Sequence, residues 1–215
     1  MFCVDLGRQQ GDSVWARETL SELARLYEIE CISINAHRIN SAVRSYSIPL
    51  VSKGIALIWN ILSLWYGLRS VICFNPQVIY SDSPPGSLTP AVLSILTGKP
   101  LVMEVHGPAG AQDVALYRAR FPLRATIARL IERIMLRRAS LIIAAPGWAR
   151  LVQTVHGIPD QRIGIAPLAV NRDLFRPLDQ VEQRQHLGLP PQVPVAVFVG
   201  NIGPWQGLDL SLIHI

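Results

Sequence analysis

Apolar and polar positions follow two periods along the chain, which predict a series of strands and helices. Short apolar runs rich in β-branched residues are typical of strands. They lie at residues 1–6, 29–35, 76–82, 99–107, 139–146 and 161–168. Apolar residues three and four positions apart are typical of amphipathic helices. They lie at residues 14–27, 87–98, 113–138 and 148–157. This alternation predicts an α/β fold, in which helices cover both faces of a parallel sheet.

The composition of the chain changes after residue 176. Prolines recur between residues 177 and 194, around a short helical pattern at 180–189. Residues 195–200, VAVFVG, then form a β-branched run that predicts the first strand of a second sheet. We therefore expect a first domain over 1–176, a linker over 177–194 and the start of a second domain over 195–215.

The segment from Leu50 to Phe74 is strongly apolar and has no charged residue between Lys53 and Arg69. This uncharged stretch is shorter than the ~18–20 residues that a transmembrane helix needs. Trp59 and Trp65 also make it less apolar than a typical span. The pattern favours a helix buried against the sheet, and it leaves open an interfacial helix and a transmembrane helix.

The segment from residue 113 to 138 combines many arginines with an apolar face. Its apolar positions have i, i+3 and i+4 spacing, and they are Leu123, Ile127, Leu130, Ile131 and Ile134. A solvated arginine face and a contact with an anionic membrane surface through Arg129, Arg133 and Arg137 explain this pattern equally well. Nucleic acid is the less favoured partner, because the arginines are not interleaved with exposed aromatic residues.

The composition bounds the class of protein. Of the 215 residues, 50% are hydrophobic and 16% are charged, which is enough for a buried core and excludes a disordered chain. The three cysteines form no CxxC pair and the histidines have no metal-ligand spacing, so we expect thiols in a reducing compartment and no metal site. The N-terminus lacks the layout of a signal peptide, and we expect a cytoplasmic protein.

Two segments carry candidate chemistry. Glu104 and His106 alternate at the end of a predicted strand, so their side chains should lie on the same side of it, and Gly107 then ends the strand. Ligands of open parallel sheets bind beyond the carboxyl ends of the strands. The loop containing Gly11 joins the first predicted strand to the first helix, where backbone N–H groups can bind phosphate or sugar oxygens. Neither a GxGxxG motif nor a GxSxG motif is present.

Three stretches together resemble glycosyltransferase family 4. ASLIIAAPGWARLVQTVHGIPDQRIGIAPLAVNRDLFRP resembles the late part of the first domain of these enzymes, and FVGNIGPWQGLDL resembles the opening of their second domain. VMEVHG resembles the strand that ends in their active-site histidine. The resemblance implies the GT-B fold, with two Rossmann-like domains and an active site between them. It also implies retaining transfer of a sugar from a nucleotide sugar, with no cofactor and usually no metal.

The resemblance also assigns roles to individual residues. His106 matches the active-site histidine, with Asp12, Glu104 and Gly107 on the acceptor side. The donor-binding residues it implies are Gly11, Gly200, Asn201, Gln206 and Gly207. Many members of the family have basic residues where this chain has Asn201 and Gln206. These two side chains can hydrogen-bond to a donor diphosphate, but they carry no charge to neutralise it.

We therefore expect the first domain of a glycosyltransferase that acts on a lipid-linked or cell-envelope glycan at the inner face of a membrane. A second domain of usual size would continue for about 150 residues. The sequence is thus expected to be a truncated product with little activity. Two alternatives stay open: a non-catalytic domain that binds a membrane or a partner, and a nucleotide-sugar epimerase with the same fold.

Overall fold

The computed structural model describes residues 6, 11–34, 43–48, 56–82, 87–106, 122–167, 169–170 and 172–200. Contacts divide the chain into two units, Met1–Pro167 and Leu168–Ile215. The strand predicted at 1–6 lies outside the described residues except for Leu6, and residues 113–121 of the predicted long helix also lie outside them.

The first unit alternates strands and helices, as the sequence predicts. Its strands are β1 (Glu30–Ile34), β2 (Arg44–Ile48), β3 (Ile79–Asp82), β4 (Leu101–Val105), β5 (Leu141–Ala144) and β6 (Ile163–Ile165). Its helices are α1 (Gly11–Leu23), α2 (Ala56–Cys73), α3 (Thr89–Thr97), α5 (Pro122–Arg138), α6 (Pro146–His156) and the short 3₁₀ helix η2 (Asp160–Arg162). The strand β2 was not predicted, and the predicted helix at 14–27 begins and ends three to four residues earlier in the structure.

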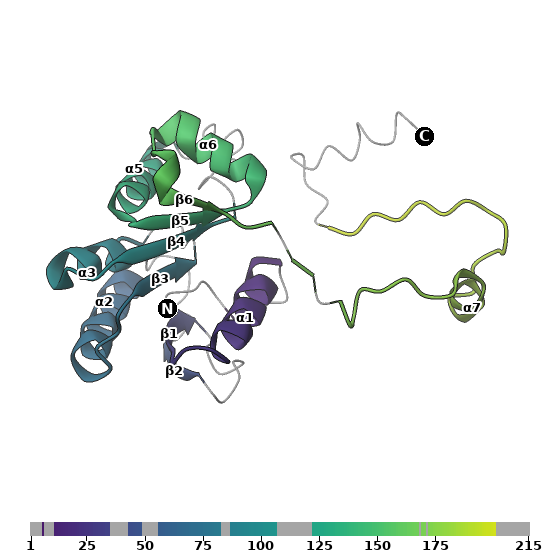
Figure 1. Cartoon of the computed structure of the whole chain (residues 1–215), viewed down its shortest axis with the longest axis horizontal. Coiled ribbons are helices and arrows are strands. Elements are labelled where there is room, and N and C mark those ends of the chain that lie inside the picture. Colours follow the sequence, from purple (N-terminus) through teal and green to yellow (C-terminus); the bar gives the residue numbers. More distant parts are fainter. Residues whose placement is uncertain are drawn as a thin grey trace. The chain divides into compact units, whose positions relative to one another are not determined.

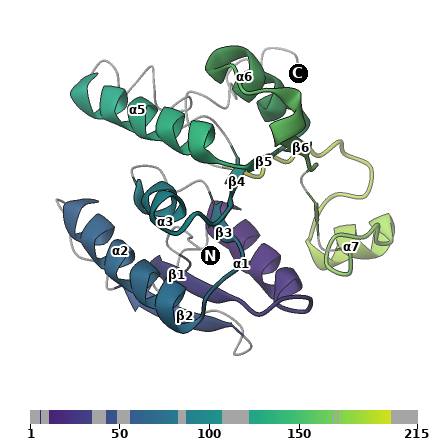
Figure 2. The same ribbon diagram turned by 60° about the vertical axis from the view of Figure 1, so that its left-hand side comes forward.

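All the described strand pairs are parallel. The strands β3, β4, β5 and β6 form one sheet in that order, and β1 pairs with β2. The helices α2, α3 and α5 lie side by side on one face of the sheet, and α1 lies on the other (Figures 1 and 2). This is the predicted α/β class, with parallel strands and helices on both faces.

The larger hydrophobic core lies between the sheet and the helices α2, α3, α5 and α6. Alternate residues of β4, Met103 and Val105, point into it and meet Leu93, Met135 and Leu136 from the helices. A smaller core on the α1 side contains Leu6, Ala16, Leu20, Cys31 and Val43. The strand β4 therefore presents one set of side chains to the large core and leaves the other set, which includes Glu104, for the side of α1.

Within the apolar segment predicted at 50–74, residues 56–73 form α2, which packs on the large core. Trp59, Leu62 and Leu68 are partly buried against that core, and Tyr66 stacks on Tyr46 of β2 with ring centroids 5.1 Å apart. Among the helices that the structure describes, none is both long and apolar enough to cross a membrane. Cys73 at the end of α2 is exposed, whereas Cys31 in β1 is buried.

The last turn of α5 is held by a distant arginine. The guanidinium of Arg162 donates hydrogen bonds from Nη2 to the carbonyl oxygens of Leu136, at 3.1 Å, and Arg137, at 2.8 Å, and also to that of Ala139. Carbonyl groups at the end of an α-helix have no partner within the helix, because no N–H group of a following turn is there to donate to them. A positive charge there also suits the helix dipole.

The second unit contains one described helix, α7 (Gln180–His186), inside the proline-rich segment. Asp179 caps it by accepting a hydrogen bond from the N–H of Glu182 at 2.8 Å. None of the residues described between 169 and 200 is buried. The strand predicted over 195–200 was wrong for the described structure, where these residues have no strand partner. A β-branched run predicts a strand only where another strand is available to pair with it.

Candidate active site

Polar side chains gather where β3 and β4 end. Asp82 is the last residue of β3 and lies directly opposite Glu104 of β4 in the parallel register. His106 follows β4, and its Nε2 is 3.8 Å from Oε1 of Glu104. The alternation of Glu104 and His106 therefore brings both side chains to one side of the strand, as predicted.

The imidazole of His106 is held by a buried carboxylate. Its Nε2 lies 2.7 Å from Oδ1 of Asp82, and the side chain of Asp82 is 2% exposed, against 19% for His106. An ionised carboxylate can only accept, so this hydrogen bond places a proton on Nε2. Asp82 thus fixes both the orientation and the tautomer of a histidine that solvent can reach.

Glu104 is held by two donors from different elements. The indole Nε1 of Trp15 in α1 donates to Oε1 at 2.6 Å, and the hydroxyl of Tyr80 in β3 donates to Oε2. The edge of the Trp15 ring also meets the ring of His106, with centroids 5.8 Å apart and an angle of 76°. Asp82, Glu104, His106, Trp15 and Tyr80 therefore form one connected cluster, called the His106 cluster below.

The start of α1 lies beside the His106 cluster. Gly11 is the first residue of α1, one turn before Trp15. The helix is fixed in place by Ala16 and Leu20 in the smaller core, and by a 2.6 Å hydrogen bond from Arg17 to the carbonyl oxygen of Leu6. The first turn of a helix offers N–H groups that anions and sugar oxygens can accept. The predicted roles of Gly11 and Asp12 stay predictions, which this position makes reasonable.

The other predicted site residues are not placed beside His106 by the structure. Gly107, Asn201, Gln206 and Gly207 lie outside the described residues, and Gly200 is the last residue described in the second unit. Arg129, Arg133 and Arg137 belong to α5, which covers the face of the sheet opposite α1 (Figure 1).

Sequence reasoning missed Asp82, Tyr80 and Trp15. The signal for Asp82 was present, because the carboxyl ends of neighbouring parallel strands meet at the same edge of a sheet. The predicted strand at 76–82 ends in Ser81 and Asp82, just as the next one ends in Glu104 and His106. Trp15 carries no such signal, since an indole on an amphipathic helix is usually a core residue.

One metal-ligand arrangement exists among the described residues. Ligand atoms of Asp82, Glu104 and His106 lie within 4.8 Å of one another, which is close enough for a shared ion. However, the two Glu104 oxygens already accept hydrogen bonds, and His106 bonds directly to Asp82. The arrangement is complete as a hydrogen-bonded cluster, apart from Oδ2 of Asp82, which is buried without a partner. Such a group costs the fold free energy and so favours a functional role for Asp82.

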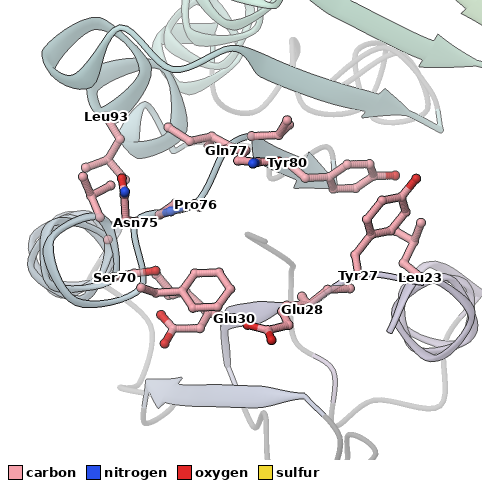
Figure 3. Close-up of a pocket in the computed structure, with 17 residues that line it drawn as sticks. Leu23, Tyr27, Glu28, Glu30, Ser70, Asn75, Pro76, Gln77, Tyr80 and Leu93 are labelled. Atoms are coloured by element: carbon pink, nitrogen blue, oxygen red, sulfur yellow. The ribbon is translucent and has the colours of Figure 1, made fainter. Parts of the chain in front are cut away.

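A separate cavity of about 620 Å³ opens between β1 and β3. Figure 3 shows that it is lined by Leu23 at the end of α1, by Tyr27 and Glu28 between α1 and β1, by Glu30 of β1, and by the end of α2 with the residues that follow it. Glu30 and Ile79 begin their strands, so the cavity lies mainly at the amino ends of the strands. Tyr80 of the His106 cluster lines it, whereas Asp82, Glu104 and His106 do not. Because parallel sheets bind ligands at the carboxyl ends of strands, we place the candidate site at the His106 cluster.

Comparisons with known proteins show to which family the chain is similar. A family model described as Glycosyltransferase Family 4 matches residues 11–174. The D-inositol 3-phosphate glycosyltransferase of Mycobacterium tuberculosis is 34% identical over 116 residues, which are 53% of this chain and 24% of that protein. The protein of the same name from Acidothermus cellulolyticus is 31% identical over 117 residues, 54% of this chain and 26% of that one. The chain thus matches about a quarter of the length of these relatives.

A solved structure shares the fold. The crystal structure of a putative UDP-N-acetylglucosamine 2-epimerase from Listeria monocytogenes superposes with a TM-score of 0.51 and 9% identity, over 75% of this chain and 43% of that chain. At this identity the likeness concerns the fold alone. The family model, in contrast, covers most of the chain, including α1 and the ends of β3 and β4. The chain therefore belongs to glycosyltransferase family 4.

Proposed function

We propose that this chain provides the acceptor side of a retaining glycosyltransferase. The enzyme would transfer a sugar from a nucleotide-sugar donor to a hydroxyl group of a lipid-linked or cell-envelope glycan, at the cytoplasmic face of a membrane. The observation that carries the proposal is the His106 cluster, a buried carboxylate–imidazole pair at the carboxyl edge of the sheet of a family 4 domain.

The His106 cluster is better suited to holding the acceptor hydroxyl in position than to removing its proton alone. With Nε2 bonded to the buried carboxylate of Asp82, the imidazole of His106 is held in a fixed position, where it can orient a sugar hydroxyl. Two donors hold Glu104 beside it, so the site needs little rearrangement when a substrate binds. Holding the hydroxyl and the sugar carbon in reacting geometry can supply a large part of the rate enhancement.

The charge of the site favours a neutral acceptor group. Two buried carboxylates, Asp82 and Glu104, surround the imidazole, and both would repel a phosphate placed beside it. The names of the relatives indicate D-inositol 3-phosphate as their acceptor. For this chain we propose instead that the reacting part of the acceptor is an uncharged, hydroxyl-rich sugar. D-inositol 3-phosphate is the obvious comparison substrate.

Two parts of the chain would contact the diphosphate of the donor. Backbone N–H groups near Gly11 and Asp12 would face the diphosphate from the first turn of α1. Gly200, Asn201, Gln206 and Gly207 would contact it from the second unit. Because Asn201 and Gln206 are neutral, we expect the backbone to contribute more to diphosphate binding here than in members with basic residues at these positions.

The test is a transfer assay with radiolabelled nucleotide sugars and bacterial lipid extract as the acceptor. Since the chain matches about a quarter of its relatives' length, the assay uses both this chain and the product of the complete reading frame that contains it. The variant His106→Ala should lower transfer by about 100- to 1000-fold, the loss typical of removing one group that stabilises a transition state. His186→Ala, an exposed histidine of α7, is the matched control and should keep full activity.

Each outcome decides between the proposal and an alternative. If His106→Ala retains full transfer in a protein that is active, the His106 cluster is not the active site. If the product of the complete reading frame binds lipid but transfers no sugar, the domain is non-catalytic. Conversion of the nucleotide sugar without any acceptor would instead support an epimerase, an alternative that otherwise depends on the fold alone.

A further inference from the structure

The layer formed by α2, α3 and α5 exposes many large apolar side chains to solvent. These helices lie next to one another on the same face of the sheet (Figure 2). The exposed apolar residues, called the outer helical face below, are Ile58, Ile61, Trp65 and Ile72 of α2, Ile95 and Leu96 of α3, and Leu123, Ile127, Leu130 and Ile134 of α5. Single exposed apolar residues are common, but a patch spread over three neighbouring helices indicates a binding surface.

The helix α5 has two apolar sides, and one of them is exposed. Leu123, Ile127, Leu130 and Ile134 follow each other at intervals of four, three and four residues, which places them in one line along the helix. Leu123 is 72% exposed and Leu130 is 57% exposed. The opposite side, with Met135 and Leu136, is fully buried in the large core. The exposed line is therefore not needed to pack α5 on the sheet.

The helix α2 repeats this arrangement. Ile58, Ile61, Trp65 and Ile72 are three, four and seven residues apart and so share one side of the helix. Its other side packs on the large core through Trp59 and Leu62. The side chain of Trp65 is 66% exposed, although tryptophan side chains are highly buried on average. Tryptophan and tyrosine are enriched at the boundary between lipid and water.

The charges on this layer are almost all positive. Arg129, Arg133 and Arg137 form a row at intervals of four residues, immediately beside the apolar line of α5. The sequences of α2, α3 and α5 contain one acidic residue, Glu132, and it is buried on the inner side. A surface that joins apolar side chains to a row of arginines complements an anionic lipid bilayer in both respects.

We propose that the outer helical face lies on an anionic lipid bilayer. The apolar side chains would enter the boundary between headgroups and acyl chains, and the arginine row would contact lipid phosphates. The contact would be shallow, with the helices parallel to the bilayer plane. Because the His106 cluster lies on the α1 side of the sheet, this binding leaves it uncovered. The inference does not depend on sugar transfer.

The first experiment is co-sedimentation of the chain with vesicles. Vesicles of phosphatidylcholine mixed with phosphatidylglycerol should bind the chain, and vesicles of phosphatidylcholine alone should bind it much more weakly. Replacing Arg129, Arg133 and Arg137 together by Glu should weaken binding to the mixed vesicles on the order of 100-fold, at about fivefold per well-placed charge. Replacing Arg150, Arg172 and Arg176 by Glu changes the net charge equally at exposed positions elsewhere and should have a far smaller effect.

A second variant tests the apolar part of the surface. Ile127→Gln combined with Leu130→Gln should weaken binding to the mixed vesicles by about tenfold for each side chain that inserts. Lipids with brominated acyl chains should quench the fluorescence of the wild-type chain, and the variant Trp65→Phe should lose much of that quenching. Circular dichroism of each variant checks that the helices are intact.

Three results would overturn the proposal. One is equal binding of the arginine variant and its matched control to the mixed vesicles. Another is a wild-type chain, folded by circular dichroism, that stays in solution with those vesicles. The third is a concentration-dependent dimer, seen by analytical ultracentrifugation, that dissociates in the Ile127→Gln, Leu130→Gln variant, because the outer helical face would then bind a second copy of the chain.

Discussion

The His106 cluster and the outer helical face depart from the usual distribution of side chains in opposite ways. The cluster places two carboxylates in the interior, beside a partly exposed imidazole, and each carboxylate needs a partner to offset lost hydration. The outer helical face leaves large apolar side chains in water, where a more polar residue would serve the fold equally well. Neither arrangement helps the first unit to fold. The comparison teaches that function is best sought where a fold carries such costs.

The strand β4 separates the two regions. Glu104 points towards α1 and the His106 cluster, whereas its neighbours Met103 and Val105 point into the core beneath α3 and α5. Substitutions in the two regions share no side-chain partner, and effects at such independent sites usually add. The predictions below test this separation, beginning with the largest effect.

The largest effect is expected from Asp82→Asn. Asparagine keeps the shape of the side chain but removes the negative charge that accepts from Nε2 of His106. The imidazole would lose its fixed tautomer, and we expect sugar transfer to fall by about 100-fold, as for a displaced catalytic group. The measurement is kcat as a function of pH, where a changed pH profile distinguishes positioning of His106 from a structural role. The control Asp160→Asn, at an exposed position of η2, should change neither kcat nor its pH profile.

A smaller effect is expected from Trp15→Phe. Phenylalanine fills most of the space but cannot donate to Oε1 of Glu104, which then keeps only the hydroxyl of Tyr80 as a donor. A buried acceptor left without a donor costs about 1–3 kcal/mol. Urea unfolding should show a decrease of this size in the free energy of unfolding. An unchanged value would mean that the indole nitrogen does not stabilise Glu104. Binding to anionic vesicles should not change, since the two regions are separate.

His156 reports on the arginine row. Burial lowers the pKa of His156, and the charges of Arg133 and Arg137 lower it further, while Glu132 lies 3.9 Å away, too far for a hydrogen bond. A histidine that resists protonation when folded gives its full stability above its unfolded pKa of about 6.5, and this stability is lost as the pH falls below that value.

The variant His156→Gln should therefore lose less stability than the wild type between about pH 7.5 and 5.5, the range in which histidine titrates. Thermal unfolding at the two pH values measures this difference. NMR titration gives the sharper test, because Arg137→Gln should raise the pKa of His156. If the pKa of His156 were the same in Arg137→Gln as in the wild type, the charge of Arg137 would not act on this histidine of α6.

The smallest effect on stability is expected from Leu130→Gln. This side chain lies on the exposed line of α5, so its replacement should change the free energy of unfolding by no more than about 0.5 kcal/mol. Met135→Ala, on the buried side of the same helix, should cost about 2–5 kcal/mol and serves as the contrast. If Leu130→Gln destabilised the chain as strongly as Met135→Ala, the outer line would be part of a core.

The sequence predicted those features that depend on residues close together in the chain. Alternation placed Glu104 and His106 on one side of β4 correctly, and helical spacing found α3, α5 and α6. Asp82 was missed because its partner lies 24 positions away and is reached only through the register of β3 with β4. The strand β2 was missed for the same reason, since its pairing with β1 is what makes it a strand. On α5, both sides are apolar, so spacing alone could not tell which one the sheet covers.

The arginine at position 162 ties the completion of α5 to a later event in synthesis. The carbonyl groups that it caps belong to residues 136, 137 and 139, so the capping residue leaves the ribosome 23 to 26 residues after them. At a synthesis rate of about 5–20 residues per second, the end of α5 waits on the order of one to five seconds for its cap. During that interval β5 and α6 have been made, and they must turn the chain back before the cap arrives. A slow codon placed within this stretch would prolong the time during which the end of the helix is open.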